Sequence, residues 1–355
     1  VAINGETGKV GPHGLFNAQY QDWLDGGKAL DIADYSGSLS PAGGNVYEVD
    51  SLQGLRDLLG FAAESDYTFR LTTDLDLASA PGLYIPRLAA ELDGGGHTVT
   101  NLHLDRLDSN LGFVGLVTAD GTIRALHLTG AEVAGQGFVG GLAGANYGEL
   151  NQVSAVGSVS GSDFNVGGLV GKNSGPITDA YASGDVSGSD FNVGGLVGEN
   201  YGTITNAYAS ADVTGTKWRV GGLVGSNDKK GSITNAYATG GVEGEQDVGG
   251  LVGRNYDEGS ISNAYATGSV SGADDVGGLI GFNGRLGTVA EGYWDTATTG
   301  QDAGIGFDYN SQSGNVTGLT TAEMQDPFTF IDAGWDFAGT WGKSASDNNG
   351  GYMVL

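Results

Sequence analysis

The chain has 355 residues, with 15 basic and 42 acidic side chains that give a formal net charge of −27 at pH 7. Such an acidic surface repels phosphate backbones and anionic lipids, so we expect no nucleic-acid partner and no insertion into membranes. The sequence has no cysteine, which excludes disulfides, thiolate metal sites and a cysteine nucleophile. Acidic surfaces attract Ca²⁺ as well as keeping a protein soluble, so calcium is the one cofactor left open.

The N-terminal part predicts one short capping helix. Residues 1–45 match no pattern and form a segment of unknown role. The chain begins at Val1 with no Met or signal peptide, which suggests a processed product or an excised piece. Asp50 and Ser51 precede leucines at helical spacing and supply a helix N-cap, so we expect a helix near 51–63.

Irregular strands follow this helix. Residues 67–71 and 97–104 are rich in β-branched, aromatic and alternating apolar residues, and the second run comes directly after a turn at 93–96. We expect them to form the first, imperfect coils of a repeated structure.

A cassette then repeats six times from about residue 137. In each copy Val-Gly-Gly-Leu is followed by an aliphatic residue or Ala, then Gly, one variable residue and Asn. A fixed period of this kind indicates stacked units that bury their apolar faces against one another. The glycine pairs, spaced 27 or 28 residues apart, are Gly140-Gly141, Gly167-Gly168, Gly194-Gly195, Gly221-Gly222, Gly249-Gly250 and Gly277-Gly278.

The remainder of each unit also repeats. Three short apolar pieces per period, bounded by Gly, Asn, Ser or Asp, are typical of strands and turns. The spacing therefore predicts an all-β, right-handed parallel β-helix over residues 46–295, with the cassette leucines in one buried ladder. One row is Asn in every copy, and we expect its amides to hydrogen-bond along the axis. Another row is Tyr in five copies and faces either the core or solvent: Tyr181, Tyr208, Tyr237, Tyr265 and Tyr293.

Residues 296–355 predict an irregular C-terminal cap. Thr320 and Glu323 have the spacing of a helix capping box. The aromatic residues of this tail are expected to seal the last coil: Trp335, Phe337, Trp341 and Tyr352.

These blocks together resemble the GLUG-motif repeats of bacterial filamentous-haemagglutinin-like adhesins. The resemblance covers about residues 46–355 and includes the glycine cassettes, the run Leu92–Leu102, the block Gly292–Asp295 and the segment Ala333–Phe337. It implies a secreted or surface-held bacterial protein of the two-partner secretion type, used in attachment or biofilm cohesion. The implied partner is an extracellular glycan or a surface receptor on a host or bacterial cell, and we expect the isolated chain to be monomeric.

One aromatic row suggests a binding surface. Phe164, Phe191 and Trp218 occupy the same position in three successive copies, whereas the next two copies have Gln246 and Asp274. A row that alternates between aromatic and polar residues is expected at the surface, where sugar rings stack on aromatic faces. Asp163 and Asp190 stand beside two of the rings and are expected to bind sugar hydroxyls or a bridging Ca²⁺. The alternative is an aromatic ladder that only stiffens a loop.

Two other classes of function stay open. Parallel β-helices also carry polysaccharide-degrading enzymes, which need paired carboxylates and a basic residue on one face. The richest candidate zone contains Asp93, His97, His103, Asp105, Arg106, Asp108, Arg124 and His127. Because Asp favours turns and strand His residues commonly face solvent, we expect no catalytic residues and no enzyme. A passive spacer that presents another domain is the third alternative.

Overall fold

The computed structural model describes residues 38–309, 316–344 and 349–355, with short pieces at Ile3–Asn4, Lys9–Val10, Gly14–Leu15 and Ile32. The three N-terminal pieces are strands β1, β2 and β3, which pair antiparallel. Most of the predicted N-terminal segment 1–45 lies outside the described residues, so its role stays open.

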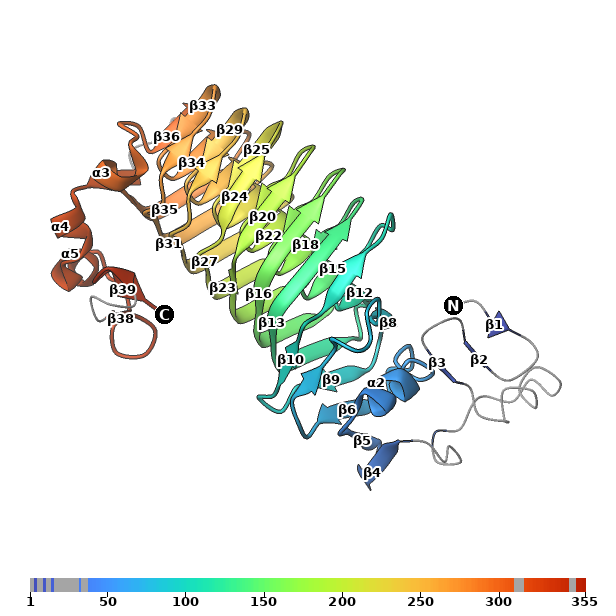
Figure 1. The fold of residues 1–355 in the computed structure, drawn as a ribbon. Helices are drawn as coiled ribbons and strands as arrows, with labels where there is room; N and C mark the ends of the chain where they lie inside the picture. The colour runs from blue at the N-terminus through green and yellow to red at the C-terminus, as the bar shows by residue number, and fades with distance from the viewer. Residues whose placement is uncertain are drawn as a thin grey trace.

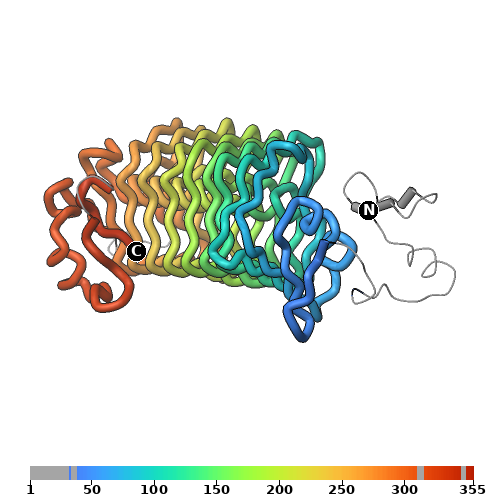
Figure 2. The backbone as a smooth tube through the Cα atoms, turned by 60° about the horizontal axis from the view of Figure 1, so that its bottom comes forward, coloured from blue at the N-terminus to red at the C-terminus, as the bar shows by residue number. Residues whose placement is uncertain are grey.

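The rest of the chain winds into a parallel β-solenoid, as the repeat spacing predicts (Figure 1). Three sheets run along it. Its coils are stacked along one axis (Figure 2). We call the three sheets the broad sheet, the second sheet and the short sheet. The second sheet contains β8 (Ile85–Leu88), β12 (Val114–Val117), β15 (Ala143–Asn146), β18 (Val170–Asn173), β22 (Val197–Asn200), β26 (Val224–Asn227), β30 (Val252–Asn255), β34 (Ile280–Asn283) and β36 (Ile305–Asp308).

The short sheet is built from the residues just before each glycine pair. Its strands are β14 (Val139–Gly140), β17 (Val166–Gly167), β21 (Val193–Gly194), β25 (Trp218–Gly221), β29 (Gln246–Gly249) and β33 (Asp274–Gly277).

The broad sheet collects the remaining solenoid strands. In its first part these are β4 (Leu39–Gly43), β5 (Val46–Val49), β6 (Thr68–Leu71), β7 (Leu75–Asp76), β9 (Glu91–Asp93), β10 (Thr98–Thr100), β11 (His103–Asp105), β13 (Thr122–Gly135) and β16 (Glu149–Gly161). In its second part they are β19 (Pro176–Ser183), β20 (Asp185–Gly188), β23 (Thr203–Ala209), β24 (Asp212–Gly215), β27 (Ser232–Ala238), β28 (Val242–Glu243), β31 (Ser260–Ala266), β32 (Val270–Ser271), β35 (Thr288–Asp295) and β37 (Val316–Leu319).

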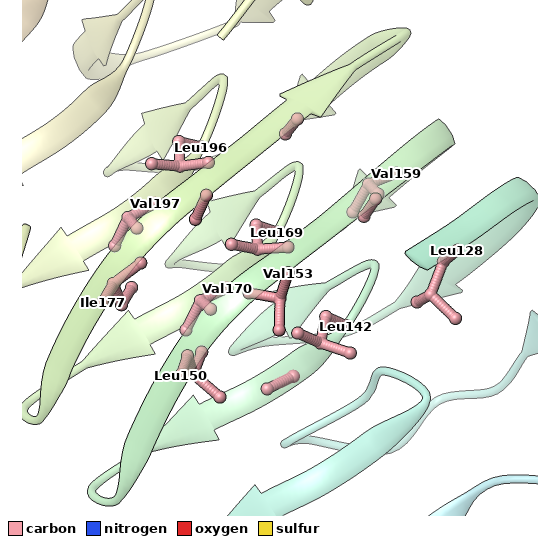
Figure 3. Close-up of a cluster of buried hydrophobic side chains, with 14 of the residues drawn as sticks. Leu128, Leu142, Leu150, Val153, Val159, Leu169, Val170, Ile177, Leu196 and Val197 are labelled. Atoms are coloured by element: carbon pink, nitrogen blue, oxygen red, sulfur yellow. The ribbon is translucent and has the colours of Figure 1, made fainter. Parts of the chain in front are cut away.

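The cassette leucines form the buried ladder that the spacing predicts. Leu142, Leu169 and Leu196 stack one above the other in the core (Figure 3), and each side chain is 0% exposed. The three further leucines, Leu223, Leu251 and Leu279, are equally buried. Aliphatic residues of the broad sheet, such as Leu150 and Ile177, close the core from the opposite side (Figure 3). Burial of this apolar surface, repeated in each coil, is the main stabilising term of the fold.

The glycine pairs are required because backbones approach each other closely. A Cβ atom on Gly195 would overlap the carbonyl oxygen of Gly222 in the next coil, and one on Gly194 would overlap the carbonyl oxygen of Val197. No side chain fits at either position, which explains why the sequence tolerates the entropic cost of these glycines.

The asparagine row forms a continuous internal ladder, which confirms its architectural role. In β18 and β22 the Nδ2 atom of Asn173 donates to Oδ1 of Asn200 at 2.9 Å, and Asn200 donates to Asn227 at 2.8 Å. The ladder starts at Asn146 and continues through Asn255 to Asn283, which donates to Asp308 at 3.1 Å. All six asparagines are 0% exposed, so each amide in this row depends on its neighbours for hydrogen bonds.

The tyrosine row lies on the outer face of the broad sheet. A residue with positive φ, such as Asp179 (φ 52°) or Asn206 (φ 54°), stands two places before each tyrosine and shifts the alternation of the strand. Ala180 and Ala182 therefore face the core, and Tyr181 between them faces outward. The rings of Tyr181, Tyr208, Tyr237 and Tyr265 stack with centroids 4.8–5.0 Å apart and planes within 5° of parallel.

Both ends of the solenoid carry extra structure (Figure 2). At the N-terminal end the hairpin of β4 and β5 pairs with β6, and helix α2 (Leu52–Leu58) begins after Ser51, whose hydroxyl accepts a hydrogen bond from the N–H of Gly54. The predicted helix is thus present but ends at Leu58, where turns replace its last residues. At the C-terminal end come α3 (Thr296–Thr299), α4 (Thr321–Met324), α5 (Pro327–Asp332), and the strand pair β38 (Gly342–Lys343) and β39 (Met353–Val354). Thr320 and Glu323 make the predicted capping box.

The aromatic residues of the C-terminal cap do not seal the end of the last coil as expected. They pack on the outer face of the solenoid, where Trp335, Trp341 and Tyr352 contact the ring of Tyr265. Together with Tyr237, Tyr293, Met324, Phe330 and Met353 they form a second hydrophobic cluster, separate from the solenoid core. The physical reason is the outward tyrosine ladder, which offers the cap a large apolar surface along the side of the stack.

Candidate functional site

The predicted aromatic row lies on the loops that join the broad sheet to the short sheet. We call residues 162–165, 189–192 and 216–219 the tip loops. Phe164 and Phe191 are half-buried, and their rings stack with centroids 5.7 Å apart and planes 13° from parallel. Phe138, from the preceding coil, meets Phe164 edge to face at 4.9 Å. These two phenylalanines therefore use part of their ring surfaces on one another, in agreement with a ladder that stiffens the loops.

Trp218 is the exposed member of the row. Its side chain is 49% exposed, and strand pairing puts Gln246 and then Asp274 in the same position of the next coils. The change coincides with the loop length, because Val220 lies seven positions after Val213, whereas Val248 lies only six positions after Val242. The aromatic row thus ends where the tip loop becomes shorter, and Trp218 stands at that end.

Charged side chains flank the rings. Asp190 pairs with Lys217 at 3.0 Å, and the Arg219 guanidinium lies 5.6 Å from the centroid of Phe191. Asp163 is partly exposed. Across the described ranges no group of three or more His, Cys, Asp or Glu side chains is arranged to hold a metal ion. A bridging Ca²⁺ at Asp163 and Asp190 stays a prediction that needs an additional ligand.

An ionic network beneath the tip loops fixes them to the second sheet. Glu199 is its centre: it accepts hydrogen bonds from Asn165 Nδ2 at 3.1 Å and from the Tyr201 hydroxyl at 2.7 Å, and it pairs with Lys172 at 3.6 Å. Burial and the adjacent Glu199 carboxylate raise the pKa of Tyr201, so this hydroxyl stays protonated. The Lys172 ammonium also lies 4.8 Å from the Tyr201 ring centroid. The tip loop that carries Phe164 is therefore anchored to the second sheet through Asn165.

The network continues one coil further with two arginines. Arg254 pairs with Asp228 at 2.7 Å, while Arg219 donates to Asn192 at 3.4 Å. Asp247 is 8% exposed, and its burial raises its pKa to about 6 in spite of the nearby arginines. The sequence shows these charges but not their burial, because nothing in the pattern indicates that the tip loops fold back over the second sheet.

The residues considered for an enzyme make ion pairs and hydrogen bonds that are spread over the early coils. Asp93 pairs with Arg70 at 2.8 Å and with Arg124 at 2.7 Å. His97 contacts Asp74 at 3.3 Å, His103 contacts Glu132 at 3.1 Å, and Arg106 pairs with Asp108 at 2.6 Å. His127 contacts the Ser154 hydroxyl at 2.9 Å. All of these contacts except Arg106–Asp108 link neighbouring rungs, and the absence of a catalytic role stays a prediction. Among the described residues no helix is long and apolar enough to span a bilayer.

Comparisons with known proteins give a family for the repeats. A family model described as the GLUG motif matches residues 162–187, 189–214, 218–243 and 244–271. Halomucin of Haloquadratum walsbyi is 33% identical over 132 residues, which cover 33% of this chain and 1% of halomucin. A "Putative Gly-rich membrane protein" of Evansella cellulosilytica is 32% identical over 125 residues, which cover 31% of this chain and 14% of that protein.

A solved structure shares the fold. It is that of a "putative immunoglobulin A1 protease" from Bacteroides ovatus, which superposes with a TM-score of 0.54 at 18% identity and covers 87% of this chain and 91% of its own. At this identity the likeness concerns the fold alone. The matched segments span only a small part of the two sequence relatives. Residues 162–271 of this chain are thus a run of GLUG-motif repeats, built into a parallel β-solenoid.

Proposed function

We propose that the chain is an attachment module, secreted or displayed at the cell surface, that binds extracellular carbohydrate through the tip loops. GLUG repeats on a solenoid fit a surface-protein module, and one of the relatives is named a membrane protein. The observation that carries the proposal is the half-exposed Trp218, which stands at the end of a stiffened aromatic row with Lys217 and Asp190 beside it.

The chemistry of this site suits sugars. An indole ring that is half in water offers an apolar face for a pyranose ring, while adjacent charged groups hydrogen-bond to hydroxyls. The loop of Trp218 is tied to the preceding tip loop, because Lys217 pairs with Asp190 and Arg219 donates to Asn192, so little conformational entropy is lost when a ligand binds. Phe164 and Phe191 support the loop and add edge contacts, and Trp218 supplies the main stacking surface.

The test is a glycan array, followed by measurement of the affinity for the best ligand. Replacing Phe164, Phe191 and Trp218 together by Ala should weaken binding at least tenfold, since each lost stacking contact costs on the order of 1 kcal/mol. Trp218→Ala alone should account for most of the loss. Phe307→Ala is the matched control, because this ring is similarly exposed, at 45%, but lies on the second sheet.

Other outcomes would identify the competing functions. A folded triple variant that binds as well as the wild type would move the binding site elsewhere. No binding to any glycan or cell surface would favour a passive spacer. Release of reducing ends or unsaturated products from polysaccharides, abolished by Asp93→Asn or His97→Ala, would establish an enzyme.

A further inference from the structure

The C-terminal cap leaves part of the tyrosine ladder uncovered. Tyr237 and Tyr265 are buried beneath the cap, at 5% and 0% exposure, whereas Tyr208 and Tyr181 in the two preceding coils are only half-buried. The edge of the cap therefore makes a step on the outer face of the broad sheet, between β23 and β27.

A cleft of about 630 Å³ lies at this step. Its floor consists of Tyr208, Ser210, Tyr237 and Thr239, and the cap contributes Lys343 and Asn349 to its wall. A second hollow of about 400 Å³ adjoins it along the ladder, lined by Asp179, Tyr181 and Asn206 of the solenoid and by Thr340 of the cap. Both hollows border Tyr208, and their sizes are those of small-ligand sites.

The cleft lining is rich in groups that bond to hydroxyls. It combines the hydroxyls of Tyr, Ser and Thr with the amide of Asn349 and the ammonium of Lys343, and aromatic rings border it. The Asn349 amide is held in place, since it donates to the Tyr265 hydroxyl at 3.1 Å. Strand backbones below are already paired with their neighbours in the broad sheet, so the floor offers no free edge for an extended peptide.

The charge of the protein around the cleft favours a neutral ligand over an acidic one. One lysine faces the main cleft, Asp179 faces the adjoining hollow, and the whole chain has a net charge of −27. A polyanion would meet repulsion from the protein as a whole, whereas a neutral ligand would not. Side chains that both donate and accept match the hydroxyls of a neutral sugar.

We propose that the cleft between the tyrosine ladder and the C-terminal cap binds a neutral oligosaccharide of two or three sugar units. The inference deepens the proposed attachment function, on which it rests, because it adds a second carbohydrate site away from the tip loops. Since the cleft is formed by both the solenoid and the cap, the ligand would also bridge the two.

The experiment compares two variants of the same structural row. Ser210→Trp fills the cleft, whereas Ser183→Trp adds the same bulk at the equivalent position one coil earlier, outside the residues that line either hollow. Cellotriose, maltotriose and mannotriose are titrated into the full chain by calorimetry, with trigalacturonate as the acidic comparison. At least one neutral trisaccharide should bind with a Kd of about 1 mM or lower. Ser210→Trp should weaken it at least tenfold, and Ser183→Trp less than twofold.

A milder variant guards against misfolding. Tyr208→Phe with Tyr237→Phe keeps the stacked rings and removes two hydroxyls from the cleft, and it should weaken binding threefold or more. The inference is overturned if no neutral trisaccharide binds, if trigalacturonate binds tighter, or if Ser210→Trp binds as the wild type does. If the variant with Phe164, Phe191 and Trp218 replaced by Ala still binds the trisaccharide, the cleft is supported as the binding site. If this variant no longer binds it, the binding site lies at the tip loops. If the protein fails to attach to cells although the cleft binds a trisaccharide, the proposed attachment function is wrong and the inference about the cleft stands.

Discussion

Removing one amide from the asparagine ladder should destabilise the protein far more than removing one from its surface. Asn200 is 0% exposed, donates to Asn227 Oδ1 at 2.8 Å and accepts from Asn173 Nδ2 at 2.9 Å. In Asn200→Ala the buried Oδ1 of Asn227 loses its donor. Asn173 Nδ2 keeps its bond to the carbonyl oxygen of Gly175 at 2.8 Å, and Asn173 Oδ1 still accepts from Asn146.

The expected cost follows from these contacts. An orphaned buried acceptor costs about 1–3 kcal/mol, and the lost bond to Asn173 adds about 1 kcal/mol. Asn200→Ala should therefore lower the free energy of unfolding by about 2–4 kcal/mol. Because long repeat arrays do not always unfold in one step, chemical denaturation should be accompanied by hydrogen exchange of the amides in β22 and β26.

Asn206→Gly is the matched control. Asn206 belongs to an outer amide row, in which it donates to Asp179 at 3.0 Å and accepts from Asn235 at 3.1 Å, and its φ of 54° suits glycine. Water replaces the lost bonds on this outer face, so the change should stay within about 1 kcal/mol. If Asn200→Ala were no more destabilising than this control, the hydrogen bonds between the buried amides of the ladder would not contribute to stability.

Three further outcomes are expected. Leu196→Ala should lower the free energy of unfolding by about 2–5 kcal/mol, measured by denaturation, because it opens a cavity in the core. Gly195→Ala should prevent native stacking at that coil, seen as lost amide protection, because its Cβ would overlap the carbonyl oxygen of Gly222. The pKa of Asp247 is raised from 3.8 to about 6, so the folded state binds this proton more tightly than the unfolded chain does. The contribution of Asp247 to stability should thus fall by about 1–3 kcal/mol as the pH rises from 3.8 through about 6, and Asp247→Asn should remove this part of the pH dependence.

The solenoid could be predicted from the sequence because its main determinants are local and repeated. Each cassette holds a leucine that must be buried and glycines that must approach another backbone, so a constant spacing is enough to indicate stacked coils. The asparagine ladder follows from the same spacing, since identical amides one coil apart can satisfy each other.

The outward direction of the tyrosine ladder and the position of the C-terminal cap could not be predicted from the repeat spacing. The direction of Tyr181 depends on the positive φ of Asp179, and aspartate adopts that conformation only in some contexts. The place of Trp335 and Trp341 depends on the outward rings of Tyr237 and Tyr265, which are distant in sequence. Burial of Asp247 likewise results from contacts of β29 with strands of the second sheet. These features arise from tertiary contacts that a periodic pattern does not encode.

The in-register stacking also bears on how such a chain changes in evolution. Since Val166, Val193 and Val220 each meet an equivalent residue in the next rung, a duplicated coil would find on both sides the surface it already fits. Duplication within the gene would lengthen the rod by about 4.8 Å per coil and leave both end structures unaltered. Small insertions are absorbed as well: the turn after Asn227 is two residues longer than the turn after Asn200, yet the strands on either side keep their pairing.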